Sequence, residues 1–340
     1  MFVFLSTVKP EVQEGVTVEE GGGLLSDFTG SCSKNEADPS HHKAFLSPDE
    51  FKDNSFDLPK EFDFVRKAFF NYVMSSVLLV TRIHGRFISS YRPDDYLFSD
   101  KTGQKFDSGG SGCINRVVKV KDDGKIVDEN KRWYEGHIDK CDKCRSCLTT
   151  QDNIWYIEMF TVKHVVFDES ESRQCQVVFF DYKRDLVFDY DVVKKSDWCC
   201  GYTDIEKDYC QMFVLTENES LATKLKTELD RRDEKLLEVI ELITQNSNYK
   251  QIEKGPVVIL GYPHGRKLYL SCGRHCGKAD ESFCSLTYDT KTCKGCSGGL
   301  VVDLFWKERY CHKHPHSGSN DGTGESSDLS KELIRTTCTI

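Results

Sequence analysis

Short apolar runs bounded by polar turns are the feature of this sequence that most constrains its fold. They begin near residue 75, are rich in β-branched and aromatic side chains, and are strand-sized. The runs cover residues 77–83, 110–120, 154–162, 175–180, 209–215 and 256–261. Strands of this length, with polar turns between them, are typical of antiparallel barrels or sandwiches. The sequence therefore predicts an all-β-dominated fold.

One long helix is expected between two β-rich halves. Apolar residues recur at three-to-four spacing over residues 221–243, with charged residues between them, as in an amphipathic helix. Asn218 or Ser220 offers a capping oxygen at its start. A shorter helix is expected over residues 61–72. We interpret the long helix as a packing or interdomain element, with a regulatory role as the alternative.

The composition divides the chain into three regions. Residues 1–58 are rich in Gly, Ser and acidic residues, and we expect a disordered leader there. Residues 59–318 are expected to form the folded domain, and the polar, low-complexity residues 319–340 a flexible tail. The first β-rich part, the long helix and the second β-rich part are expected at about 75–215, 218–245 and 255–318.

Charge, hydropathy and the chain start narrow the partners and the compartment. Lys and Arg number 46 against 55 Asp and Glu, a formal charge of −9, whereas general nucleic-acid binding depends on cationic side chains. No apolar run reaches the roughly 20 residues needed to span a bilayer. The apolar start ends at Lys9-Pro10-Glu11, before an export signal would be complete. We therefore expect neither a nucleic acid nor a membrane partner, and a cytoplasmic location. In that compartment the sixteen cysteines are expected to be free thiols or metal ligands.

A glycine-rich turn carries the strongest chemical signal. Gly295-Cys-Ser-Gly-Gly leads into an apolar run that starts at Leu300. A serine nucleophile needs its oxygen exposed on a tight turn, with two backbone N–H groups directed at the developing oxyanion. Glycines permit that turn and keep the approach of a substrate open. Ser297 is therefore a candidate nucleophile, and an ordinary Gly-rich hairpin is the alternative.

A histidine and an aspartate complete a possible catalytic set. His164 follows the run at 154–162, where a strand end would hold a general base rigidly. Asp208 precedes the run at 209–215, where a carboxylate could accept the imidazole N–H and select its tautomer. Each residue alone is more often structural. Together with Ser297 they follow the order His, Asp, Ser with separations of 44 and 89 residues, close to the about 45 and about 93 of the chymotrypsin triad.

Several motifs resemble those of the trypsin-like and HtrA-like serine peptidases. Thr161-Val-Lys-His-Val-Val is similar to their histidine motif, and Gly295-Cys-Ser-Gly-Gly to their nucleophile motif. Gly110-Ser-Gly resembles the glycine turn that opens their first barrel, and Gly261-Tyr-Pro-His-Gly a turn in their second. The resemblance covers about residues 75–318 and points to an intracellular member. It implies a chymotrypsin-like fold of two six-stranded antiparallel β-barrels, with the long helix inserted between the barrels.

The resemblance also implies roles for these residues. Ser297 would attack the substrate carbonyl, His164 would take its proton and return it to the leaving amine, and Asp208 would orient His164. The N–H groups of Gly295 and Ser297 would form the oxyanion hole. No cofactor is required, and the partner is a protein or peptide substrate. Asp204 is a second candidate for the acid.

One departure from the family pattern concerns the residue before the serine. Cys296 stands where trypsins hold an Asp that pairs with a cleaved N-terminus, so activation of that kind is not expected. Cys296 is also an alternative nucleophile. Viral relatives that use cysteine place it directly before a glycine, whereas Ser297 intervenes here, so we favour Ser297.

Two further clusters give expectations about specificity and metal. The resemblance implies that Thr292 and either His314 or His316 contact an acidic or amide P1 side chain; surface histidines are the alternative. Four zinc-compatible ligands lie close together, with reduced surface thiols as the other interpretation of the cysteines. These ligands are His137, Cys141, Cys144 and Cys147.

The function predicted from the sequence is a serine endopeptidase that works through an acyl-enzyme. The alternative is a catalytically inactive protein of the same fold that binds or regulates a partner. A cysteine-rich metal-binding scaffold explains the cysteines but not the ordered histidine, aspartate and serine.

Overall fold

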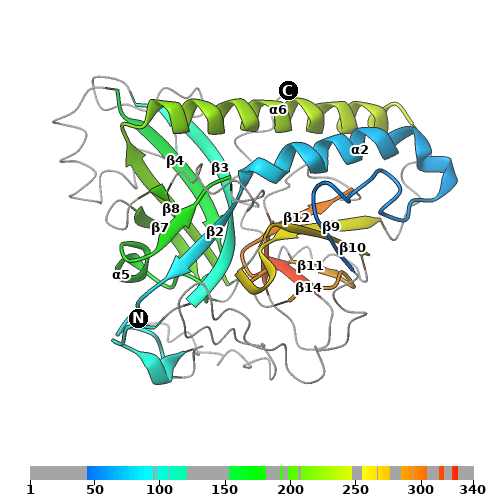
Figure 1. The fold of residues 1–340 in the computed structure, drawn as a ribbon. Helices are drawn as coiled ribbons and strands as arrows, with labels where there is room; N and C mark the ends of the chain where they lie inside the picture. The colour runs from blue at the N-terminus through cyan, green and yellow to red at the C-terminus, as the bar shows by residue number, and fades with distance from the viewer. Residues whose placement is uncertain are drawn as a thin grey trace, which may run out of the picture.

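The computed structural model describes two antiparallel sheets and a pair of long helices (Figure 1). The described residues are 44–94, 96, 98–106, 108–120, 153–180, 192–193, 198–205, 208–246, 255–265, 267–275, 285–293, 295–304, 314–317 and 324–327.

The first sheet is built from the first β-rich half of the chain. It has seven antiparallel strands in the order β6-β5-β2-β3-β4-β8-β7. The bounds are β2 Val80–Gly85, β3 Ser108–Lys119, β4 Trp155–Thr161, β5 Gln176–Val178, β6 Val192–Val193, β7 Trp198–Asp204 and β8 Tyr209–Thr216. The β4 and β8 pair is the one that matters for the site, because Thr161 at the end of β4 lies opposite Cys210 near the start of β8.

The second sheet draws on both ends of the described chain. It also has seven antiparallel strands, in the order β1-β10-β9-β12-β13-β14-β11. The bounds are β1 Phe45–Leu46, β9 Pro256–Gly261, β10 Tyr269–Arg274, β11 Ser285–Tyr288, β12 Leu300–Asp303, β13 His314–Ser317 and β14 Gly324–Ser327. Strand β14 lies within residues 319–340, which the sequence analysis assigned to a flexible tail, so that expectation differs from the structure over these four residues.

The expected β-rich architecture is confirmed at a coarse level, but closed barrels are not. Within the described residues both sheets are open, and no pairing joins the two edge strands of either sheet. The physical reason is that an apolar period identifies which segments are strands, whereas closure depends on hydrogen bonds between edges that are remote in sequence.

Two antiparallel helices pack side by side along one side of the molecule (Figure 1). Helix α2 spans Asp63–Ser76, and α6 spans Glu219–Thr244, which confirms the long helix. Asn218 is the N-cap of α6, and its side-chain oxygen accepts a hydrogen bond from the Leu221 N–H at 3.0 Å. The short helix α5 spans Glu169–Ser172. No helix in the described part of the chain is both long and apolar enough to cross a membrane.

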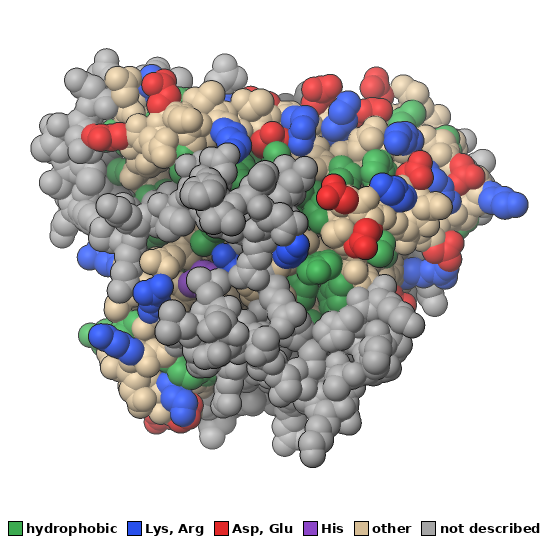
Figure 2. Space-filling view, in the orientation of Figure 1, with side chains coloured by type: hydrophobic (Ala, Val, Ile, Leu, Met, Phe, Trp, Pro, Cys, Tyr) green, Lys and Arg blue, Asp and Glu red, His purple; other side chains and the backbone are tan. Residues whose placement is uncertain are grey.

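The two faces of α6 differ as the sequence pattern predicts. Its apolar residues are buried against α2 and β3. Its outer face carries ion pairs such as Lys226 with Asp230, and Figure 2 shows acidic and basic side chains interspersed along this flank. The buried apolar stripe therefore stabilises the packing of the helix on the domain, because exposed ion pairs contribute little to stability.

Residues 44–58 differ from the disordered leader expected up to residue 58. Phe51 and Phe56 are almost fully buried and pack on α2 through ring contacts. The Arg66 guanidinium donates to three backbone carbonyls of this segment, those of Asp53, Phe56 and Leu58. The composition was misleading here because widely spaced aromatic residues, rather than a periodic apolar face, make the contacts. Residues 1–43 lie outside the described residues.

The first described residues reach the segment that carries the candidate nucleophile. Strand β1 pairs with β10, with Phe45 opposite Ser271. The Phe45 side chain forms a buried cluster with Cys293 and Cys296, and Tyr269 packs against this cluster. The N-terminal segment therefore covers the loop just before Ser297.

Loss of the Phe45 ring is expected to open this cluster. In Phe45→Ala, alkylation of Cys293 and Cys296 by iodoacetamide should accelerate roughly tenfold, because lost packing raises the population of the locally open form. Peptide mass spectrometry of time-resolved samples measures this. Cys113, fully buried elsewhere in the core, is the internal control, and Phe45→Leu should retain most of the protection. Equal protection of Cys293 and Cys296 in wild type and Phe45→Ala would show that the ring does not cover the loop.

Candidate active site

His164 and Asp208 form a close pair. The His164 Nδ1 lies 2.6 Å from Asp208 Oδ2, and the His164 backbone N–H donates to Asp208 Oδ1 at 2.9 Å. Their side chains are 13% and 22% exposed, so both still reach solvent. The carboxylate accepts at Nδ1, which leaves Nε2 of a neutral imidazole as the acceptor nitrogen.

The pairing of β4 with β8 produces this contact. His164 lies in the tight turn that follows β4, where the Val165 N–H donates to the Val162 carbonyl at 3.1 Å. Asp208 precedes β8 with a φ of 45°, a left-handed conformation that Asp tolerates better than most residues. The Lys163 N–H also donates to the Asp208 carbonyl at 3.2 Å. Backbone and side chain of Asp208 thus both hold the turn that bears His164.

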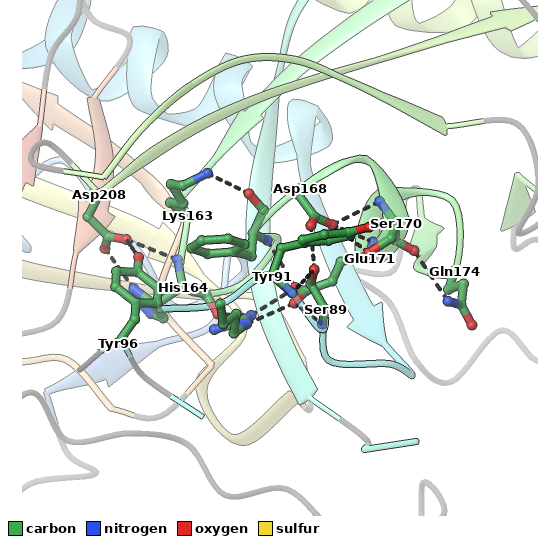
Figure 3. A network of polar contacts seen from close by, with 12 residues as sticks. Ser89, Tyr91, Tyr96, Lys163, His164, Asp168, Ser170, Glu171, Gln174 and Asp208 are labelled. Atoms are coloured by element: carbon green, nitrogen blue, oxygen red, sulfur yellow. Dashed lines mark hydrogen bonds and ion pairs between the residues drawn. The ribbon is translucent and has the colours of Figure 1, made fainter. Parts of the chain in front are cut away.

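Two more donors meet the Asp208 carboxylate, and sequence reasoning did not identify either. Ser317 Oγ donates to Oδ2 at 2.7 Å, and the Tyr96 hydroxyl donates to Oδ1 at 3.2 Å. Figure 3 shows Tyr96 and His164 both directed at Asp208. Burial opposes ionisation, but the charge of His164 and the hydrogen bonds from His164 and Ser317 outweigh it and hold the pKa of Asp208 below its ordinary value. Asp208 is therefore an ionised acceptor at neutral pH.

Ser297 lies in a double turn whose shape requires glycine. The Cys296 N–H donates to the Cys293 carbonyl at 3.0 Å, and the Gly299 N–H donates to the Cys296 carbonyl at 2.8 Å. Gly295 and Gly298 occupy the third position of these two turns with φ of 92° and 83°. A positive φ at that position is the requirement of a type II turn, which glycine meets without strain.

Ser111 in β3 holds this turn against the first sheet. Its N–H donates to the Ser297 carbonyl at 2.7 Å, and its hydroxyl donates to the Gly295 carbonyl at 2.6 Å. A side chain on Gly298 would lie 2.0 Å from the Ser111 carbonyl oxygen and 2.3 Å from Thr161 Oγ1. The Gly110-Ser-Gly segment was expected to be a turn; it is instead the interior of a continuous strand. Its small residues allow close approach rather than reversal of the chain.

Two consecutive residues of β13 connect the serine turn to the aspartate. The His316 carbonyl accepts from the Gly298 N–H at 2.7 Å, and the His316 N–H donates to the Gly299 carbonyl at 2.8 Å. The next residue, Ser317, donates to Asp208. Ser297 is 6% exposed, and among the described residues its hydroxyl makes no hydrogen bond to His164. The chain thus gathers the three groups in one region, with a hydrogen bond between only two of them.

His316 is buried in a polar contact of its own. Its Nδ1 lies 2.6 Å from the Tyr288 hydroxyl. Burial lowers the pKa of His316 to about 3, and the nearby charge of His164 acts in the same direction. His316 is therefore neutral at physiological pH. Thr292 is partly buried, and within the described residues it has no hydrogen bond to His316, while the His314 side chain lies outside the described residues.

The other residues expected from the sequence are the alternative acid, the zinc ligands and the cysteines. Asp204, the second candidate acid, accepts from the Tyr202 hydroxyl at 3.3 Å. The proposed zinc ligands lie outside the described residues, and no metal-binding group occurs among the residues that are described. The eight described cysteines carry free thiols.

The two residues that the sequence analysis missed differ in how well they could have been found. Ser317 lies within a polar serine- and glycine-rich stretch, so nothing in its neighbours distinguishes it. Tyr96 lies in a long connection between β2 and β3 without an apolar period. Only the contact with Asp208 marks either residue.

The close packing at Gly298 leads to a stability prediction. Gly298→Ala should lower the free energy of unfolding by about 3 kcal/mol or more, because a methyl group would overlap the Ser111 carbonyl in addition to the cost of a left-handed conformation. Gly103→Ala is the matched control: its φ is 71°, but a side chain there would meet only Ser90 Cβ at 3.9 Å. The control should cost about 1 kcal/mol in urea unfolding. Equal losses in the two variants would contradict the close approach of β3 and the serine turn.

Comparison with known proteins finds only weak similarity, and only to solved structures. No protein-family model matches the chain, and none of the curated proteins matches it. It is similar to the solved structure of the HtrA-type protease AlgW with tripeptide, with TM-score 0.40 and 13% identity, and to the serine endoprotease from Yersinia pestis, with TM-score 0.39 and 14% identity. Each match covers 78% of this chain, but only 61% and 65% of those proteins. The chain thus spans less than two thirds of their length.

Proposed function

We propose that this chain is a serine endopeptidase with His164, Asp208 and Ser297 as its triad. The observation that carries the proposal is the 2.6 Å contact of His164 Nδ1 with Asp208. The glycine turn that bears Ser297 is hydrogen-bonded through its backbone to β13, and Ser317 of the same strand donates to Asp208. The two sheets with the site between them are consistent with a chymotrypsin-like arrangement.

The proposed reaction follows from the positions of these groups. Ser297 Oγ attacks the carbonyl carbon of the scissile peptide bond while its proton passes to His164 Nε2. The imidazolium keeps its Nδ1 proton on Asp208, whose low proton affinity stabilises the charge. The proton then moves to the leaving amine as the C–N bond breaks, and water hydrolyses the acyl-enzyme by the same route in reverse.

The oxyanion that forms during attack needs backbone donors. We assign this role to the N–H groups of Gly295 and Ser297. The Ser297 N–H has no acceptor among the described residues, and the turn hydrogen bonds hold its direction. Preorganised donors of this type contribute about 3 kcal/mol each to lowering the barrier.

A catalytically inactive binding protein of the same fold is the second candidate. The observation that favours it is the low exposure of Ser297, at 6%, together with the missing hydrogen bond to His164 in the described part of the chain. The two candidates differ in one property, the reactivity of the Ser297 hydroxyl.

A fluorophosphonate probe separates the two candidates. We expect it to label the wild type at Ser297, to miss Ser297→Ala, and to label His164→Ala slowly because the general base is absent. Peptidase activity should fall about 10⁴-fold or more in Ser297→Ala. Ser90→Ala, which removes an exposed serine, is the matched control and should behave as wild type. A folded wild type that resists the probe would favour the binding protein. Inactivation of the peptidase by iodoacetamide but not by the fluorophosphonate would favour Cys296 as nucleophile.

We also propose that His316 contributes to recognition of an acidic or amide P1 side chain. When the neutral His316 imidazole accepts a hydrogen bond from the Tyr288 hydroxyl at Nδ1, its own hydrogen is on Nε2. It can therefore donate to the oxygen of Glu, Asp, Gln or Asn. The position of His316, bonded through its backbone to the glycines after Ser297, supports this role.

A peptide library that varies P1 tests this assignment. The wild type should prefer Glu, Asp, Gln or Asn over Leu at P1. In Tyr288→Phe the preference for these residues over Leu should fall about tenfold, because the hydrogen bond from the Tyr288 hydroxyl no longer selects the tautomer of His316. Activity without any such preference in the wild type would refute the assignment and leave the triad unaffected.

A further inference from the structure

A buried ion pair lies next to the catalytic histidine. Arg92 Nε donates to Glu171 Oε1 at 2.8 Å, and Arg92 Nη2 donates to Oε2 at 2.8 Å. Their side chains are only 0% and 4% exposed. A bidentate ion pair of this kind fixes the relative position of the two segments through two parallel hydrogen bonds. Removal of either partner would leave the other as an uncompensated buried charge.

The pair connects the loop at residues 88–98 to the turn that carries His164. Glu171 also accepts from the backbone N–H groups of Ser89 and Phe167, at 2.8 and 2.9 Å. Arg92 Nη2 in turn donates to the His164 carbonyl at 3.3 Å. Figure 3 shows this set of contacts extending from Ser89 to His164. The loop and the histidine turn therefore have a common support.

Tyr96 is the residue of this loop that reaches the catalytic pair. Its ring packs on Phe167 with centroids 5.1 Å apart, and the Arg92 guanidinium lies 5.8 Å from the ring centroid. Its hydroxyl donates to Asp208 Oδ1 at 3.2 Å, the oxygen that also accepts the His164 backbone N–H. Burial and the negative charge of Asp208 raise the pKa of the Tyr96 phenol, so it remains a donor at every pH the enzyme would meet.

We propose that Tyr96 is a positioning residue for the His164–Asp208 pair, placed by the Arg92–Glu171 ion pair. Its hydrogen bond fixes the rotation of the carboxylate and withdraws charge from the oxygen that faces away from the imidazole. The consequence for catalysis rests on the proposed peptidase function, but the effect on His164 does not. No part of the role requires Tyr96 to touch the substrate.

The sign of the effect follows from the charges around the pair. Removal of the Tyr96 hydroxyl leaves the carboxylate with more concentrated negative charge, which favours the protonated imidazole. Other titratable or charged groups lie near the pair: Arg92 in the loop with its partner Glu171, Lys163 beside His164, Cys210 on β8 and His316 on β13. The buried thiol of Cys210 and the imidazole of His316 are neutral, so neither adds a charge that would mask the change.

The experiment uses Tyr96→Phe, which keeps the ring and removes only the hydroxyl. We expect the midpoint of the His164 imidazole titration, followed by NMR of ¹⁵N-histidine and assigned by its loss in His164→Gln, to move up by roughly half a pH unit. Tyr91→Phe is the matched control, because Tyr91 lies in the same loop, is 80% exposed and makes no side-chain hydrogen bond to the described residues. Ser317→Ala, which removes another donor to Asp208, should move the midpoint in the same direction.

The kinetic measurement follows the same change. The acid limb of kcat/KM for Tyr96→Phe should move up with the NMR midpoint, and KM should stay within about twofold, since no substrate contact is lost. An unchanged midpoint in folded Tyr96→Phe, equal to that of Tyr91→Phe, overturns the proposal. A shifted midpoint in a protein that no fluorophosphonate labels would confirm the role of Tyr96 and refute the peptidase function instead.

Discussion

A carboxylate that is partly withdrawn from water must be met by hydrogen-bond donors, and the site depends on how Asp208 meets this requirement. Its two oxygens accept from the turn after β4, from Ser317 on β13 and from Tyr96 in the loop before β3. These segments are far apart in the sequence, and they belong to both sheets. One partly exposed carboxylate therefore joins three parts of the chain, and its two contacts with His164 hold that residue in place.

A second constraint is the space available between the sheets. The serine turn can lie against β3 because Gly110 and Gly298 have no side chains at the contact, and because Ser111 satisfies the carbonyls of the turn. A polar backbone buried at such a junction would otherwise be costly. The support on the other side comes from Phe45, which packs on Cys293 and Cys296. The loop that carries the candidate nucleophile is thus held by the first described residues and by β3.

Local patterns allowed some elements to be predicted, and they failed where remote contacts decide. The α6 helix followed from an apolar period and an asparagine cap, both of which act within a few residues of one another. The strands also followed from local composition, but their arrangement as open sheets did not. Residues 44–58 were misjudged because Phe51 and Phe56 become meaningful only when α2 is present to receive them. The order and spacing of His164, Asp208 and Ser297 were visible in the sequence, whereas the contact between His164 and Asp208 was not.

The sequence by itself determined which segments are strands and helices, and it marked a glycine-rich turn as a place where a serine could react. These properties depend on side-chain period and on the conformational freedom of glycine, which are local. The tertiary structure alone decided that Ser317 and Tyr96 complete the hydrogen bonds of Asp208, and that Arg92 and Glu171 support the segments around it. Such contacts join residues up to 112 positions apart, and their energies depend on burial that no local pattern specifies.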